Sequence, residues 1–201
     1  MDQSPPSLQQ LCAAAVRRLT ALAEVVDGET PEHSRRVGRA AESVARRMGL
    51  DREFVAVIRE AAPLHDVGKF EVTRSILEKP GPLTTREREE MQRHAAAGAS
   101  LCLEAGDDPV LRMAARIARS HHERWDGRGY PDRSAYDSTP LAARIVAVVD
   151  VYDALVSQRP YKGPWAPERA VRFLSEHAGT QFDPDVVAAF VSLAACNELA
   201  A

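Results

Sequence analysis

The segment from Leu141 to Val156 is the most apolar stretch of this 201-residue chain, and it restricts the fold more than any other feature. Thr139 and Pro140 stand just before it, in an order typical of a helix start. Asp150 interrupts its aliphatic run. A carboxylate in that setting is costly to bury unless it is paired or bound to a metal ion. The sequence therefore predicts a core helix with an acidic side chain that needs a cationic partner.

Helical periodicity continues through the rest of the chain, with start signals in front of the expected helices. Thr84 to Glu87 forms a capping box, and Asp51 and Asp108 precede two further helical runs. Pro63 is expected to interrupt a helix shortly before a His-Asp pair. No alternation typical of β-strands extends over a useful length. We therefore expect an all-α fold, a helical bundle with about eight helices.

The N-terminal 28 residues are expected to form one separate element. Apolar side chains recur at helical spacing through residues 8–26, until Gly28 ends the run. We predict an amphipathic helix over residues 1–28 and one domain over residues 29–201, because a chain of this length builds a single core. The helix packs either on this domain or on a second copy of the chain, which would make a homodimer.

Charge and cysteine content exclude several classes of protein. The formal net charge of -3 gives no field that would attract a nucleic acid polymer or an anionic membrane. Cys12, Cys102 and Cys196 are far apart and odd in number, which fits a reducing compartment. No apolar run approaches the ~18 residues needed to span a bilayer. We expect a cytoplasmic protein with neither a membrane nor a nucleic acid polymer as its partner.

The histidines carry the chemistry of the chain. His65 and Asp66 are adjacent, and Lys69 follows three positions later. Imidazole and carboxylate together suit a divalent transition metal, which lowers the pKa of water and favours hydrolysis. Alone, a His-Asp pair is weak evidence of a metal site. Five of the six histidines, however, lie in patterned segments of the chain, namely His33, His65, His94, His121 and His122.

Each of these residues also has a simpler structural interpretation. A histidine among alanines, such as His94, is more often a core or surface residue of a helix than a ligand. An acidic residue near a helix start, such as Glu29, is common because its charge complements the helix dipole. That interpretation and the function of a metal ligand are about equally expected for Glu29. The adjacent His121 and His122 face a glycine-rich loop at the end of a helix, where ligands are more typical than packing residues.

The order of these motifs resembles the HD-GYP family of metal-dependent phosphodiesterases, over roughly residues 27–192. The segments that carry the resemblance, besides the His-Asp pair, include His33-Ser34-Arg35-Arg36-Val37, His121-His122-Glu123, Gly129-Tyr130-Pro131, Asp150-Val151-Tyr152-Asp153 and Arg159-Pro160-Tyr161. One such match would be weak, but the ordered set is specific.

The resemblance implies an all-helical HD domain that hydrolyses cyclic di-GMP to the linear dinucleotide, to GMP, or to both. It assigns the two-metal core to His33, His65, Asp66, His94, His121, His122 and Asp150, with Asp66 as the bridging ligand. It implies that Lys69 holds a phosphate oxygen. Further substrate contacts are expected from Tyr130, Asp153, Arg159 and Lys162. Two or three ions are expected, iron or manganese, with Glu29 as the ligand of a third.

The chain departs from the family pattern at several positions. Residues 132–139 contain no glycine where the family usually has some, and Glu71 and Thr73 replace a small residue and a proline. No ligand is lost, which favours an enzyme. The alternatives are hydrolysis of another cyclic dinucleotide or nucleotide, and a non-catalytic signalling module. Diguanylate cyclases or adaptor proteins that bind the Gly-Tyr-Pro loop are further expected partners.

Overall fold

Capping side chains start helices α3 (Arg52–Ala61) and α5 (Thr85–Glu104) where the sequence predicts them. The Asp51 carboxylate accepts a backbone N–H from the first turn of α3 at 2.8 Å. Thr84 and Glu87 form a reciprocal capping box at the start of α5. Each cap satisfies N–H groups that the first turn of a helix leaves without an intrahelical partner.

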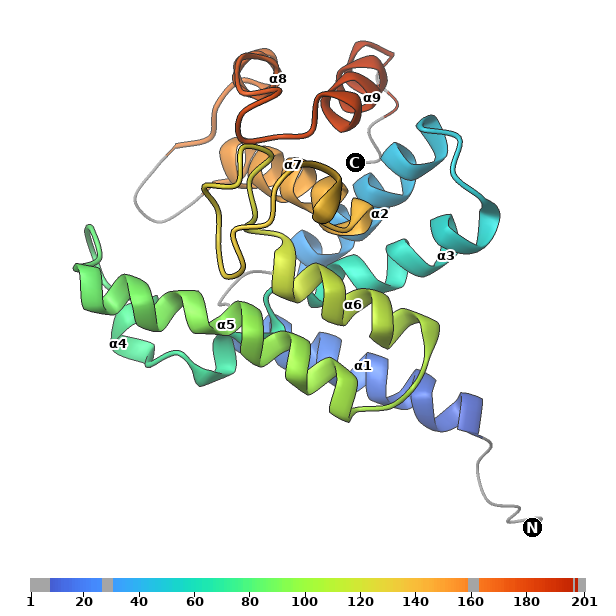
Figure 1. Cartoon of the computed structure of the whole chain (residues 1–201), viewed down its shortest axis with the longest axis vertical. Helices are drawn as coiled ribbons and strands as arrows, with labels where there is room; N and C mark the ends of the chain where they lie inside the picture. Colours follow the sequence, from blue (N-terminus) through green and yellow to red (C-terminus); the bar gives the residue numbers. More distant parts are fainter. Residues whose placement is uncertain (1–7, 27–30, 159–162, 197, 199–201) are drawn as a thin grey trace.

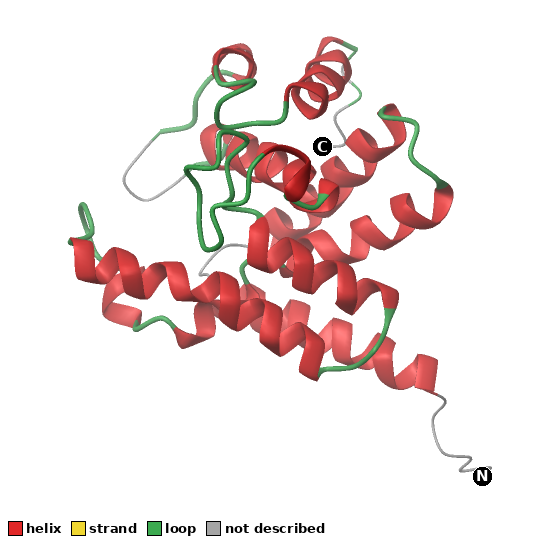
Figure 2. Ribbon diagram, viewed as in Figure 1, coloured by secondary structure: helices red, strands yellow, loops and turns green. Residues whose placement is uncertain are grey.

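The structure is a computed structural model that describes residues 8–26, 31–158, 163–196 and 198 (Figure 1). The other helices are α1 (Leu8–Val26), α2 (Pro31–Arg47), α4 (Arg74–Leu77), α6 (Pro109–Ser120), α7 (Leu141–Val156), α8 (Pro167–Glu176) and α9 (Pro184–Ala195), with the short 3-10 helices η1 (Ala62–Leu64), η2 (Val67–Glu71) and η3 (Tyr136–Ser138). These ranges contain no strand (Figure 2). The all-α prediction is confirmed, with nine α-helices in the described ranges where about eight were expected.

Helix α7 is a core helix, as its apolar sequence predicts. It packs against α2, α6, α8 and α9 (Figure 1). Ile145, Val146 and Val148 are fully buried in it. Burial of each such side chain contributes about 1.5–3 kcal/mol to the stability of the fold. Helix α7 therefore joins the four helices that it contacts in one core.

Helix α1 packs on the domain of its own chain, through η1 and η2. Leu19 and Ala23 join the hydrophobic core, whereas Val25 is 79% exposed. Of the two places proposed for this helix, the structure shows the intramolecular one, and a homodimer stays a prediction. None of the described helices is long and apolar enough to cross a membrane.

His65 and Asp66 lie in an irregular turn between η1 and η2. Pro63 belongs to η1, and a proline cannot donate the hydrogen bond that would continue α3. Leu64 and Val67, on either side of the pair, are fully buried. The predicted irregularity is confirmed, and buried neighbours hold the pair in place.

A backbone contact between two glycines fixes η2 against α5. Gly68 faces the carbonyl of His94 and the backbone of Gly98, whose Cα would lie 2.8 Å from a Cβ added at Gly68. Any side chain at Gly68 would overlap the backbone of α5, so only glycine allows this approach. The contact brings the Asp66 turn next to His94.

We predict that Gly68→Ala lowers the free energy of unfolding by about 1–3 kcal/mol, because overpacking forces the two backbones apart. At this chain length, each kcal/mol corresponds to about 2–4 °C in Tm. Thermal unfolding followed by circular dichroism measures the change. Gly163→Ala is the matched control, because a Cβ there meets nothing within 4 Å. Equal Tm values for both variants would show that the contact is not tight.

Candidate metal centre

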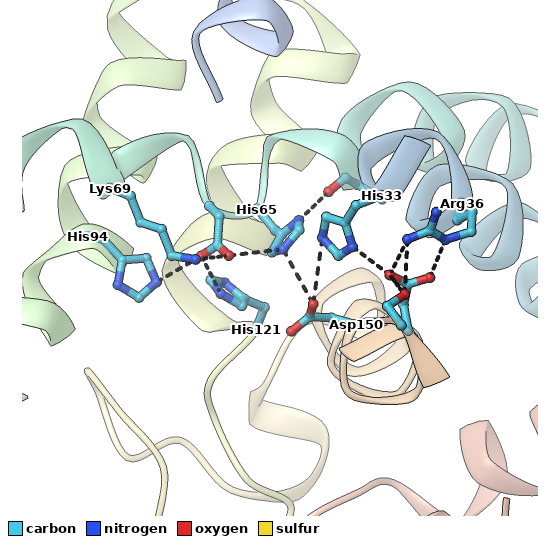
Figure 3. A network of polar contacts seen from close by, with 11 residues as sticks. His33, Arg36, His65, Lys69, His94, His121 and Asp150 are labelled. Carbon is cyan, nitrogen blue, oxygen red and sulfur yellow. Dashed lines mark hydrogen bonds and ion pairs between the residues drawn. The ribbon is translucent and has the colours of Figure 1, made fainter. Parts of the chain in front are cut away.

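Five parts of the chain bring the predicted metal ligands together (Figure 3). They are α2, the turn between η1 and η2, α5, the C-terminal end of α6, and α7. The ligand atoms form two groups, within each of which they lie no more than 4.8 Å apart: Asp66, His94, His121 and His122 in one, and His33, His65 and Asp150 in the other. Every residue predicted for the two-metal core belongs to one of these groups.

Backbone carbonyls orient three of the imidazole rings. The Nδ1 of His65 donates to the carbonyl of Ala62 at 3.0 Å, and that of His94 donates to Met91 at 2.6 Å. The Nδ1 of His121 lies 3.0 and 3.1 Å from carbonyls of α6. A carbonyl only accepts, so each Nδ1 carries a hydrogen and each ring points its Nε2 into the centre, where that atom can bind a metal ion in place of a proton.

Asp66 lies between the two groups. Its Oδ2 is 3.2 Å from the Nε2 of His65. Its Oδ1 is 3.3 Å from the Nε2 of His94 and 3.4 Å from that of His121. One carboxylate oxygen therefore faces each group, which is the geometry required of a bridging ligand.

His33 is oriented by a carboxylate instead of a carbonyl. Its Nδ1 donates to Oδ2 of Asp153 at 2.7 Å, and its Nε2 lies 3.9 Å from Oδ1 of Asp150. Arg36 donates to both oxygens of Asp153, at 2.5 and 2.9 Å, and Ser157 donates to Oδ2 at 3.2 Å. Asp153, which we predicted as a substrate contact, has these protein donors as its partners. The resulting chain of contacts is the carboxylate–histidine arrangement typical of metal sites.

Lys69 reaches the same centre from η2. Its Nζ is 2.7 Å from Oδ2 of Asp66, the oxygen that faces His65, and its side chain is only 17% exposed. A mostly buried ammonium group beside a bridging carboxylate is well placed to stabilise further negative charge that enters the site.

The pKa values reflect this crowding of charge. Burial alone would raise the pKa of Asp66, but Lys69 and His65 outweigh it and lower the pKa well below its usual range. Burial lowers the pKa of His65, but Asp66 and Asp150 outweigh it and raise the pKa to about 9. Burial and neighbouring imidazoles lower the pKa of His122 well below 6.5. The centre thus holds ionised carboxylate beside imidazole, an environment that attracts cations.

The donor set fits divalent metal ions. Neutral imidazole nitrogen and carboxylate oxygen are ligands that such ions accept. The Nε2 atoms of His65, His94 and His121 and the Oδ1 of Asp66 are buried and make no aligned hydrogen bond to any described residue. Buried polar atoms normally find a partner, so these atoms are arranged as ligands.

The loop after α6 packs on the centre. The ring of Tyr130 stacks on His122, with centroids 4.7 Å apart and planes at 27°. A Cβ at Gly129 would lie 2.5 Å from the carbonyl oxygen of His122, so the glycine is required for this approach. An open pocket of about 500 Å³ lies beside Tyr130.

Three predicted site residues, Glu29, Arg159 and Lys162, lie outside the residues that the structure describes. One residue of the site was not predicted. Arg36 was missed, although it stands three positions after His33 and therefore on the same side of α2. A charged residue such as Arg36 on the side of a helix that carries a predicted ligand could have indicated a residue of the site.

The sequence profile of a family described as HD domain matches residues 17–186. A cyclic di-GMP phosphodiesterase of Thermotoga maritima is 44% identical over 175 residues, which cover 87% of this chain and 47% of the relative. The cyclic di-GMP phosphodiesterase response regulator RpfG of Xanthomonas campestris is also 44% identical, with 87% and 46% covered. The 3'3'-cGAMP-specific phosphodiesterase 2 of Vibrio cholerae is 38% identical, with 90% and 34% covered. The chain spans less than half the length of each of these relatives.

Solved structures share the fold. The cyclic GMP-AMP specific phosphodiesterase V-cGAP3 of V. cholerae superposes with a TM-score of 0.69 at 18% identity, over 92% of this chain and 49% of the other. The HD domain of PgpH from L. monocytogenes, solved with cyclic-di-AMP, gives a TM-score of 0.55 at 17% identity, over 92% and 96%. At these identities the similarity concerns the fold alone.

We predict that Asp153→Asn weakens divalent metal binding by about 10–100-fold at the group that contains His33, because the ring loses its charged acceptor. Titration of metal-free protein with Mn²⁺, followed by the electron paramagnetic resonance signal of the free ion, measures the affinity and the stoichiometry. Asp137→Asn is the control, since it also removes a partner of an arginine but from a side chain that is 88% exposed. Unchanged Mn²⁺ affinity in Asp153→Asn would show that Asp153 does not position His33.

Proposed function

The chain belongs to the HD domain family, and on that premise we propose that it is a metal-dependent phosphodiesterase that hydrolyses cyclic di-GMP. The resemblance to the HD-GYP family is confirmed by relatives at 35–44% identity that are named as cyclic dinucleotide phosphodiesterases. The observation that carries the proposal is Asp66, with one oxygen facing each of two groups of metal ligands.

In the proposed reaction, different residues of the chain have different functions in phosphodiester hydrolysis. Divalent ions, when bound, supply an activated water near neutral pH and neutralise phosphate charge. Asp66 would bind ions of both ligand groups, and the oriented imidazoles would bind these ions through their Nε2 atoms. Lys69 offers its ammonium group to the charge that develops on the phosphate oxygens. We assign Tyr130 to the substrate-facing side of the centre, because it stacks on His122 and lines the adjacent pocket.

The identity and number of the ions are part of the proposal. Mixed imidazole and carboxylate ligation favours iron or manganese. We propose two ions in the two described groups and a third held with the help of Glu29. Arg159 and Lys162 remain proposed substrate contacts, and Asp153 is now proposed to position His33.

A second substrate is favoured by three of the relatives, which are named as 3'3'-cGAMP-specific phosphodiesterases of V. cholerae. Phosphodiesterase 2 among them is 38% identical to this chain, so hydrolysis of that hybrid dinucleotide is the alternative. A non-catalytic module is less well supported, because all core ligands converge. A cytoplasmic location, and binding of diguanylate cyclases or adaptors to the Gly-Tyr-Pro loop, stay predictions.

We predict that Asp66→Ala abolishes hydrolysis and lowers the bound metal, because a bridging carboxylate serves both groups. Protein incubated with cyclic di-GMP and either Fe²⁺ or Mn²⁺, with products separated by chromatography, gives the activity. Metal analysis of the same samples counts two or three ions per chain. Asp107→Ala, which removes an acid that is 86% exposed, is the control. Full metal content and activity in Asp66→Ala would overturn the bridging role.

We predict that Lys69→Ala keeps its metal content and loses about 10²–10³-fold in kcat, because the ammonium group stabilises charge on phosphate. Lys69→Arg keeps a cation at the position and should lose less. Metal analysis and steady-state kinetics on the three proteins make the comparison. If Lys69→Ala also loses metal, the function of Lys69 is to hold Asp66, which it contacts at 2.7 Å.

A further inference from the structure

The loop between α6 and α7, which carries Tyr130, is also anchored away from the metal centre. Trp125 donates its N–H to the carbonyl of Gln181 at 3.1 Å, and Asp126 donates to that of Thr180 at 2.9 Å. Both acceptors belong to the connection between α8 and α9, beside which the loop passes (Figure 1). The loop therefore contacts both the metal centre and the C-terminal part of the domain.

Arg144, in the first turn of α7, contacts several of these parts at once. Its Nη1 forms ion pairs with Asp183, the N-cap residue of α9, and with Asp137 of η3 at 3.0 Å. Its guanidinium carbon lies 5.5 Å from the centroid of the Trp125 ring, which is within the range of a cation–π contact. The side chain is only 15% exposed. Contacts with the loop and with α9 therefore fix the guanidinium group over α7.

Glu123, the residue after His122, and Arg144 line the same small cavity, which has a volume of about 10 Å³. Glu123 is buried, and its Oε1 accepts the N–H of Asp132 at 2.7 Å. Its Oε2 and the Nε of Arg144 are both buried, and neither makes an aligned hydrogen bond to any residue that the structure describes. Leaving such atoms without a partner is costly, and buried polar atoms normally have one. One acceptor and one donor at this cavity thus need a common partner.

The size and chemistry of the cavity fit one water molecule. A buried water needs a volume of about 10–15 Å³ and about two to four polar partners. A cation in this cavity would face the N–H of Arg144, and an anion would face the carboxylate of Glu123. A neutral molecule that both accepts and donates a hydrogen bond satisfies both groups. Thr139, which also lines the cavity, can supply a third partner through its hydroxyl group.

We propose that Arg144 is a positioning residue for the metal centre, and that it acts through a buried water that accepts from its Nε and donates to Oε2 of Glu123. Glu123 follows His122, which belongs to one group of ligands, whereas α7 carries Asp150 of the other group. The link through the water therefore holds one residue of each group in a fixed relation. For its effect on catalysis, this inference rests on the proposed function.

A crystal structure of the wild-type protein tests the water directly. It should show one ordered water within about 2.7–3.2 Å of both Nε of Arg144 and Oε2 of Glu123. An ion at this position, a direct contact between the two side chains, or a cavity without ordered density would each overturn the proposal.

The positioning role is tested with the double variant Arg144→Met/Asp183→Asn and, as its matched control, Asp183→Asn. Both proteins lack the charged pair between α7 and α9, but only the double variant lacks the Nε donor. Relative to the control, the double variant should bind Mn²⁺ about tenfold more weakly, the lower end of the effect of groups that orient ligands. Its kcat for cyclic di-GMP should also fall about tenfold with little change in KM, because no substrate contact is removed. Circular dichroism verifies that both proteins are folded.

Equal Mn²⁺ affinity in the double variant and the control would overturn the positioning role. A loss of the same size in both, relative to the wild-type protein, would show that the ion pair with Asp183 is responsible, and would overturn the path through the water. Wild-type protein that does not hydrolyse cyclic di-GMP would overturn the proposed function instead, while the Mn²⁺ affinities and the crystal structure would still decide whether Arg144 positions the centre.

Discussion

The position of one carboxylate, that of Asp66, determines the rest of the site. A buried charge is stable only where other groups compensate it. Here Lys69 contacts one oxygen and the imidazoles surround both. Those imidazoles must in turn face inward, which the carbonyls of Ala62, Met91 and α6 achieve for three rings. A backbone carbonyl has two lone pairs, so it can orient an imidazole three positions later in the chain as well as accept a backbone N–H.

Local signals in the sequence were sufficient for the helices and for most residues that the candidate metal centre brings together. A cap such as Asp51 or Thr84 acts within one turn, so its effect is visible in a few neighbouring letters. Ligand chemistry is equally local, because an imidazole at the end of α6 remains a potential ligand whatever packs around it. This is why the ordered histidines and Asp66 indicated the family before any geometry was known.

Long-range contacts were not predictable in the same way. Arg36 and Asp153 are 117 positions apart, and nothing in either segment identifies the other as its partner. The approach of Gly68 to Gly98 depends on an absent side chain, which leaves no trace in hydrophobic periodicity. The pocket depends on the path of the loop through Arg133, whose left-handed backbone no sequence rule anticipates.

The contact of His33 with Asp153 has a consequence for folding. These residues are 120 positions apart, so the centre ties the second helix to the seventh across most of the chain. An ion held jointly by His33 and Asp150 would act as a cross-link between the two helices, and closing so long a loop carries a large entropy cost in the unfolded chain. The free energy of ion binding is then also free energy of folding. The concentration of free metal ion would thus set the fraction of the protein that is folded as well as the fraction that carries a complete centre.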